Sequence, residues 1–142
     1  MYKRQTRLKT EGAFHTFYMI AAAQHYRPVL DAAAMTAPTL RVLSNYTGTH
    51  HDPDPAAIKT RLFFQLFHPV NWIGNLETAF HDDITTIVEF GGGLGSGPAP
   101  EDKRPNLESM IKKALRGSDQ SVHYHAAINS QTLREAAEAL RS

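Results

Sequence analysis

The stretch GAFHTFYM, residues 12–19, places one histidine between a small apolar approach and the beginning of a helical pattern. Residues 3–10 before it alternate weakly and carry β-tolerant side chains, so we predict a short strand there. His15 then lies at the carboxyl end of a strand, where open α/β sheets bind their ligands. An imidazole titrates near neutral pH, so His15 can accept and return a proton. On this pattern alone, a capping or packed histidine stays an open alternative.

Length, charge and cysteine content limit the kinds of protein that this chain can be. The chain has 142 residues, of which 42% are hydrophobic and 20% charged, so we expect a single domain over residues 1–142. The net charge of +1 gives no reason to expect nucleic acid or an acidic membrane as a partner. The absence of cysteine excludes disulfides, a thiolate nucleophile and cysteine-based zinc sites. Without a long apolar run or a signal-peptide pattern, we expect a soluble, cytoplasmic protein.

Helical and strand patterns alternate along the chain. A helix is predicted over residues 16–34, with a kink or break near Tyr26 and Arg27 because Pro28 follows. Asp54 and Pro55 are typical of a helix start, and that helix should end before Pro69. Further helices are predicted at 72–80, 105–115 and from 130 onward, strands at 40–45, 84–90 and 121–128, and a loop at 91–105. This alternation predicts an α/β layer with a mostly parallel sheet.

Residue spacing excludes three motifs, two that bind phosphate and one that presents a nucleophilic serine. In the glycine cluster at residues 91–97, Ser96 stands three positions after Gly93, and Pro98 follows instead of lysine. Neither the dinucleotide fingerprint nor the P-loop is therefore present. Ser96 is not a nucleophile elbow either, because Leu94 and Pro98 occupy the places that glycine must fill. The sequence offers a candidate base without a candidate nucleophile.

Several other polar side chains have open roles. A metal could be ligated on paper by His50, His51, Asp52 and Asp54, or by His123 and His125. No second cluster has ligand spacing, so we expect no metal. Gln65 lies beside an aromatic-rich helical face, where its amide either points inward and needs a partner or stays half exposed.

Together, these segments resemble the C-terminal part of the malonyl-CoA:acyl-carrier-protein transacylase family, including the acyltransferases of polyketide synthases. The resemblance is carried by GAFHTFYM at 12–19, VLSNYTG at 42–48, Asp52-Pro53 with the helix after it, FFQLFHPVNW at 63–72 and VEFGGG at 88–93. Their order and spacing agree over nearly the whole chain. The resemblance implies part of the large, α/β-hydrolase-like acyltransferase subdomain, with a short, mostly parallel sheet flanked by helices.

The activity implied by the resemblance is a two-step acyl transfer. A serine takes malonyl from coenzyme A and passes it to the phosphopantetheine thiol of an acyl carrier protein. His15 matches the catalytic histidine, and Gln65 matches the residue that orients its imidazole. Phe14 matches the selectivity position, where a phenyl ring leaves no room for the α-methyl group of methylmalonyl. Malonyl-CoA is then a substrate, and no bound cofactor is implied.

The chain departs from the family pattern in one major respect. The family's serine lies in a G-H-S-x-G elbow upstream of its histidine, together with the arginine and glutamine that bind the acyl group, and this sequence contains no such elbow. The ferredoxin-like subdomain is also absent, and Gly91-Gly92-Gly93 replaces the family's G-P-G. We therefore expect this chain alone to be inactive and to pair with a serine-bearing half or with its own copies. A non-catalytic copy or scaffold that binds a partner subunit or carrier protein is the alternative.

Overall fold

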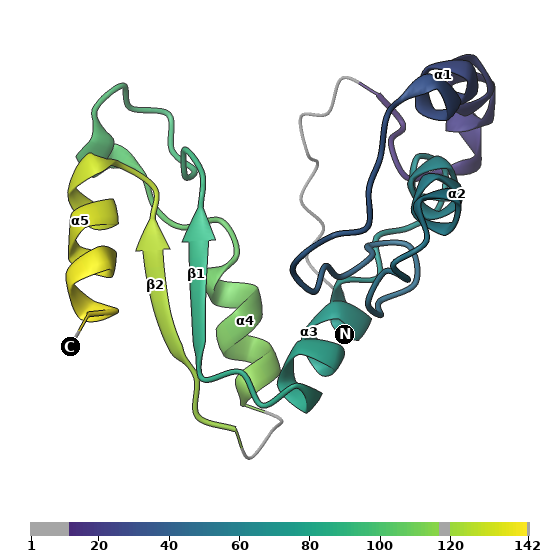
Figure 1. The fold of residues 1–142 in the computed structure, drawn as a ribbon. Helices are drawn as coiled ribbons and strands as arrows, with labels where there is room; N and C mark the ends of the chain where they lie inside the picture. The colour runs from purple at the N-terminus through teal and green to yellow at the C-terminus, as the bar shows by residue number, and fades with distance from the viewer. Residues whose placement is uncertain (1–11, 117–119, 142) are drawn as a thin grey trace, which may run out of the picture. The chain divides into compact units, whose positions relative to one another are not determined.

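Helices and strands alternate along the chain in the computed structural model, which describes residues 12–116 and 120–141 (Figure 1). In order they are η1 (Phe17–Met19), α1 (Ile20–Ala32), α2 (Pro55–Gln65), α3 (Trp72–His81), β1 (Thr86–Phe90), η2 (Pro100–Asp102), α4 (Glu108–Leu115), β2 (His123–Ala127) and α5 (Ser130–Ala139). The strand predicted over residues 3–10 lies outside the described residues. No helix in the described part of the chain is long and apolar enough to cross a membrane.

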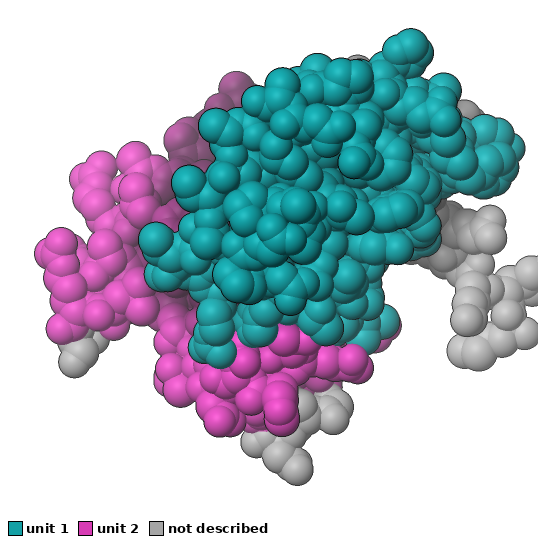
Figure 2. Space-filling model, turned by 45° about the vertical axis from the view of Figure 1, so that its right-hand side comes forward, with its two compact units in different colours: residues 1–75 teal, residues 76–142 magenta. Residues whose placement is uncertain are grey.

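Two compact units make up the chain, residues 1–75 and residues 76–142 (Figure 2). Each unit has its own packed helices or strands. The single domain over residues 1–142 stays a prediction.

In the first unit, α1 packs on α2 and buries Ala23 and Leu30. The Arg27 guanidinium lies 5.1 Å from the centre of the Phe63 ring. Of the kink or break predicted near Tyr26 and Arg27, the break is wrong, because α1 continues through Pro28 to Ala32, and the kink stays a prediction. Proline removes one helical hydrogen bond, and the contacts that Arg27 and Leu30 make on either side of it hold the helix together.

The segment between α1 and α2 is a turn, and the strand predicted at 40–45 is wrong. Leu43 forms only an isolated antiparallel bridge with His50. The Ser44 N–H donates to the Thr49 carbonyl over 2.8 Å, which closes the turn. Leu40 and Val42 are exposed, because no neighbouring strand in the described residues covers them. The run at residues 40–45 therefore lacks the neighbouring strand whose packing would make it a strand.

Asn71 anchors this turn to the start of α3. Its side chain donates from Nδ2 to the Thr47 carbonyl over 3.2 Å and accepts at Oδ1 from the Gly74 N–H over 3.1 Å. Gly48 has a φ of 72°, and a Cβ there would lie 2.5 Å from Asn71 Nδ2. Only glycine fits this backbone region without strain or a clash.

The second unit contains a parallel pair of strands, as predicted. Thr86 of β1 lies opposite His123 of β2, and Phe90 lies opposite Ala127. The connection passes through α4, because parallel strands need a crossover, and α5 packs on β2. Buried apolar residues include Ile111, Ala127, Ile128 and Ala136. In α5, Ala136 is 4% exposed, whereas Leu133 and Leu140 are 48% and 54% exposed, so the small side chain lies on the packed side of the helix.

A buried glutamate connects β1 to the beginning of α4. Glu89 is 7% exposed, and its carboxylate accepts the N–H groups of Asn106 over 2.7 Å and Leu107 over 2.9 Å, together with the Tyr124 hydroxyl. Burial alone raises the pKa of Glu89, but the three hydrogen bonds outweigh burial and lower it. Burial and the neighbouring carboxylate raise the pKa of Tyr124. Helix α4 begins at Glu108, after the predicted Pro105, because Glu89 takes up these N–H groups.

We expect Glu89→Gln to lower the free energy of unfolding by about 1–3 kcal/mol at pH 7, because a neutral amide cannot accept three donors. The folded pKa of Glu89 is depressed, so its contribution is present above the ordinary glutamate pKa of about 4.3 and is lost as pH falls through the lower folded value. Urea unfolding of both proteins between pH 7 and pH 3 measures this. The exposed Glu138→Gln is the matched control, and a pH-independent difference for Glu89→Gln would contradict the expectation.

At the turn that Asn71 anchors, we expect Gly48→Ala to lower the free energy of unfolding by about 1–2 kcal/mol or more. This is the cost of a left-handed conformation for a residue with a Cβ. Thermal unfolding followed by circular dichroism measures the loss. Gly92→Ala is the control, because a Cβ there meets nothing within 4 Å. Equal melting temperatures for the two variants would rule out the strain at Gly48.

Candidate functional site

His15 lies in the turn that leads into η1, in an uncommon backbone conformation. Its φ is 64°, in the left-handed region that residues with a side chain seldom adopt. The Thr16 hydroxyl donates to the Ala13 carbonyl over 2.7 Å and closes the turn around His15. Such conformations persist where surrounding contacts hold them, and for His15 those contacts come from the end of α2.

The last carbonyls of a helix have no partner within the helix. At the end of α2, the backbone N–H of His15 donates to the Leu66 carbonyl over 3.1 Å. Nδ1 of the same residue lies 2.9 Å from the Gln65 carbonyl oxygen. Because a carbonyl can only accept, we assign the ring hydrogen to Nδ1, which leaves the lone pair of the neutral ring on Nε2. His15 is therefore arranged to accept a proton at Nε2.

Gln65 reaches His15 through its backbone, not its side chain. Both roles considered from the sequence concerned the side-chain amide, whereas the oxygen beside His15 belongs to the main chain. Every residue type has this oxygen, so the identity of residue 65 could not have revealed the contact. The usable signal is positional: α2 begins at the predicted cap, where Asp54 accepts the N–H groups of Ala56 and Ala57, and it ends at Gln65.

Phe14 stands next to His15 on an exposed apolar surface. The side chains of Phe14, Phe17 and Tyr18 are 57%, 65% and 73% exposed. The rings of Phe17 and Tyr18 pack against each other with centroids 4.1 Å apart. Phe14, Phe17 and Tyr18, called the apolar patch below, are thus three exposed aromatic side chains within five residues that include the candidate base. Exposed apolar side chains that gather in this way mark binding surfaces.

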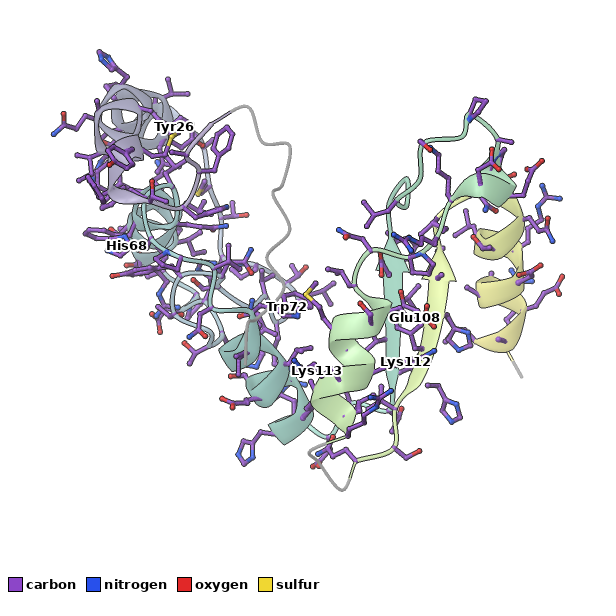
Figure 3. The ribbon with its side chains drawn as sticks, turned by 180° about the vertical axis from the view of Figure 1, so that it is seen from behind. Tyr26, His68, Trp72, Glu108, Lys112 and Lys113 are labelled. Carbon is purple, nitrogen blue, oxygen red and sulfur yellow. The ribbon has the colours of Figure 1, made fainter. Side chains whose placement is uncertain are left out.

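The aromatic-rich face predicted beside Gln65 becomes a cluster at the end of α2 that Tyr46 joins. The Tyr46 ring stacks on Phe64 with centroids 5.4 Å apart and meets the edge of His68 at 4.9 Å. His68, labelled in Figure 3, also places Nδ1 2.8 Å from the Phe64 carbonyl. The spacing of Phe64 and His68 along the helix was visible in the sequence, but the approach of Tyr46 from the distant turn was not.

The serine and asparagine of the SNYTG turn have structural roles. Ser44 is buried, and its hydroxyl accepts the Thr47 N–H over 3.4 Å. Asn45 accepts at Oδ1 from Asn75 Nδ2 over 2.6 Å. These bonds hold the turn together, and the Ser44 hydroxyl is buried within it instead of being exposed for acyl transfer.

The histidines weighed as metal ligands do not converge. In the described residues, no group of three or more histidine, cysteine, aspartate or glutamate side chains could hold a metal ion. Arg61 instead donates to the His50 carbonyl over 2.6 Å and pairs with Asp52. Burial first, and then Arg61, lowers the pKa of His51. The segment around His50 and Asp52 is therefore held to α2 by Arg61.

The glycine-rich loop at residues 91–105 is held by hydrogen bonds between its own residues. Leu94 and Arg104 form an antiparallel bridge across it, and the Lys103 ammonium donates to the Gly95 carbonyl over 2.8 Å. The Asp102 carboxylate accepts the Ala99 N–H over 3.2 Å. These polar groups hold the loop in shape and give no support for a phosphate site.

Comparison with known proteins identifies relatives by sequence. The chain is 32% identical over 91 residues to the malonyl CoA-acyl carrier protein transacylase of Bacillus subtilis, which covers 64% of this chain and 28% of the relative. It is 32% identical over 115 residues to that of Mycolicibacterium smegmatis, covering 81% of this chain and 37% of the relative. No family model matches the chain.

Solved structures agree. The malonyl CoA-acyl carrier protein transacylase (MCAT) of Mycobacterium tuberculosis superposes with a TM-score of 0.70 at 31% identity, over 92% of this chain and 38% of that one. A malonyl-transacylase solved in complex with a type II PKS acyl carrier protein gives a TM-score of 0.73 at 21% identity, over 93% and 38% of the two chains. This chain thus spans about a third of the length of the two sequence relatives. Over that span it belongs to the malonyl CoA-acyl carrier protein transacylase family.

Proposed function

We propose that this chain supplies the general base of an acyl transfer from malonyl-CoA to the phosphopantetheine thiol of an acyl carrier protein, in fatty acid or polyketide biosynthesis in the cytoplasm. The observation that carries the proposal is the 2.9 Å contact between His15 Nδ1 and the Gln65 carbonyl. It fixes the tautomer in which Nε2 can take a proton.

The first half-reaction begins when Nε2 takes the proton of a serine hydroxyl as the serine oxygen attacks the thioester carbonyl. The tetrahedral intermediate expels the coenzyme A thiolate, which takes the proton from the imidazolium. In the second half-reaction Nε2 removes the proton of the carrier thiol, whose sulfur attacks the seryl ester. The imidazolium then returns a proton to the serine oxygen. Throughout, the Gln65 carbonyl holds the Nδ1 hydrogen and stabilises the imidazolium.

In this proposal the serine is supplied by a G-H-S-x-G elbow on a separate stretch of polypeptide. We propose that the polypeptide bearing it, or a second copy of this chain, covers the apolar patch of Phe14, Phe17 and Tyr18. The carrier protein is proposed as the acceptor because one structural neighbour was solved in complex with an acyl carrier protein.

The second candidate function is a non-catalytic copy or scaffold that binds a partner subunit or a carrier protein. The lack of a G-H-S-x-G elbow in the sequence favours it. Both candidates use the same apolar patch, so binding alone does not separate them, whereas dependence of turnover on His15 does.

The test combines this chain with a polypeptide carrying the serine-bearing part of a related transacylase, purified together. With labelled malonyl-CoA we expect label on the serine-bearing polypeptide and transfer to an added carrier protein. His15→Ala should reduce transfer about 10²- to 10⁴-fold, the usual contribution of a general base. The matched control is His25→Ala, which removes an exposed histidine from α1.

Two results would count against this proposal. Stable label on this chain incubated alone would show that it contains its own nucleophile. Unchanged transfer in the His15→Ala complex would favour the scaffold.

Phe14→Ser tests substrate selectivity in the same complex. A smaller side chain leaves room for an α-methyl group, so the ratio of kcat/KM for methylmalonyl-CoA to that for malonyl-CoA should rise about 10- to 200-fold, the range for one methylene in a pocket. Phe17→Ser is the control, because it also removes an exposed ring from the patch. An unaltered ratio in Phe14→Ser would remove Phe14 from selectivity.

A further inference from the structure

We infer that His68 is a positioning residue for His15. Its Nδ1–H group holds the last turn of α2, and this turn presents the Gln65 carbonyl that keeps the His15 hydrogen on Nδ1. The inference rests on the proposed role of His15 as a base. It adds a second histidine to the site, one that acts on the first through the backbone.

The two backbone hydrogen bonds just after α2 are long. The N–H groups of Leu66 and Phe67 reach the carbonyls of Phe63 and Phe64 over 3.4 and 3.3 Å, beyond the usual range of about 2.7–3.2 Å. His68 Nδ1 approaches the Phe64 carbonyl to 2.8 Å. Of these three contacts, the one from the His68 side chain is therefore the shortest.

The two histidines bond to successive peptide units. His68 takes the Phe64 carbonyl, and His15 takes the carbonyls of Gln65 and Leu66. Rotation of one peptide unit changes the direction of the next, because they share the dihedral angles of the residue between them. A loss of the bond to Phe64 thus loosens the acceptor that His15 uses.

Aromatic contacts keep the His68 ring in place. Its centroid lies 4.9 Å from that of Tyr46, 4.6 Å from that of Phe67 and 5.6 Å from that of Phe64. Pro69 follows directly and fixes its own φ. The ring is therefore held by packing while Nδ1 makes the hydrogen bond.

Two substitutions separate the hydrogen bond from the packing. His68→Phe keeps an aromatic ring but removes the donor, whereas His68→Asn keeps a short side-chain donor and removes the ring. Long-range ¹H–¹⁵N spectra of the uniformly labelled chain report which ring nitrogen of His15 carries the hydrogen. They are recorded about two units above the ordinary histidine pKa of ~6.5, and His15→Gln assigns the signals.

The expected result is that the wild-type chain and His68→Asn show His15 with its hydrogen on Nδ1. In His68→Phe we expect a mixture of tautomers, with the His15 Nδ1 and Nε2 shifts moving toward each other. His25→Phe, at an exposed site on α1, should match the wild type. Melting temperatures within a few degrees show that His68→Phe is folded; otherwise His68→Leu, which also lacks a donor, takes its place.

Three results would overturn the inference. If His68→Phe, or the His68→Leu that replaces it, keeps the His15 hydrogen on Nδ1, the hydrogen bond from His68 is not required for that tautomer. If His68→Asn loses the tautomer as well, or if His25→Phe changes it, the donor of His68 is not the cause. A mixed tautomer in the wild-type chain would instead remove the basis of the proposed function, so the two failures are distinguishable.

Discussion

The carbonyl groups at the end of α2 need hydrogen-bond donors. The candidate site lies where two histidines supply them. A carbonyl oxygen that is buried without a hydrogen-bond partner lowers the stability of the folded protein. The backbone and ring of His15 supply two donors and the ring of His68 supplies a third. A requirement of helix geometry thus selects the tautomer of an imidazole. The left-handed backbone of His15 follows from the same requirement, because one residue must point both its N–H and its ring at the helix end.

The second unit meets the opposite requirement. There the unpaired groups are N–H donors at the beginning of α4, and a buried carboxylate accepts two of them. Glu89 belongs to β1, so the same side chain connects the strand to the crossover helix. In both units, unpaired backbone groups at a helix end form hydrogen bonds with a polar side chain from another segment. This contact joins the two segments.

The sequence predicts most of the elements and little of the site geometry. The caps at Asp54 and Pro55, the apolar run of β1 and the periodicity of α3 are local signals, and each gave an element near its observed place. At residues 40–45 the predicted strand is missing because no neighbouring strand pairs with it in the described residues, and at Pro28 the helix continues despite the local preference of proline. His15 was visible as a candidate base by its type, but its partner is a backbone oxygen fifty positions away. Sequence patterns do not distinguish one backbone oxygen from another.

The φ of 64° at His15 also bears on how this position can evolve. Glycine or asparagine adopts such a conformation more easily than histidine. The backbone strain favours a different residue at position 15, whereas the hydrogen bond from the His15 ring to the Gln65 carbonyl favours the histidine. Glycine would relieve the strain and lose that bond. Replacement at this position therefore exchanges backbone strain for an unpaired carbonyl at the end of α2.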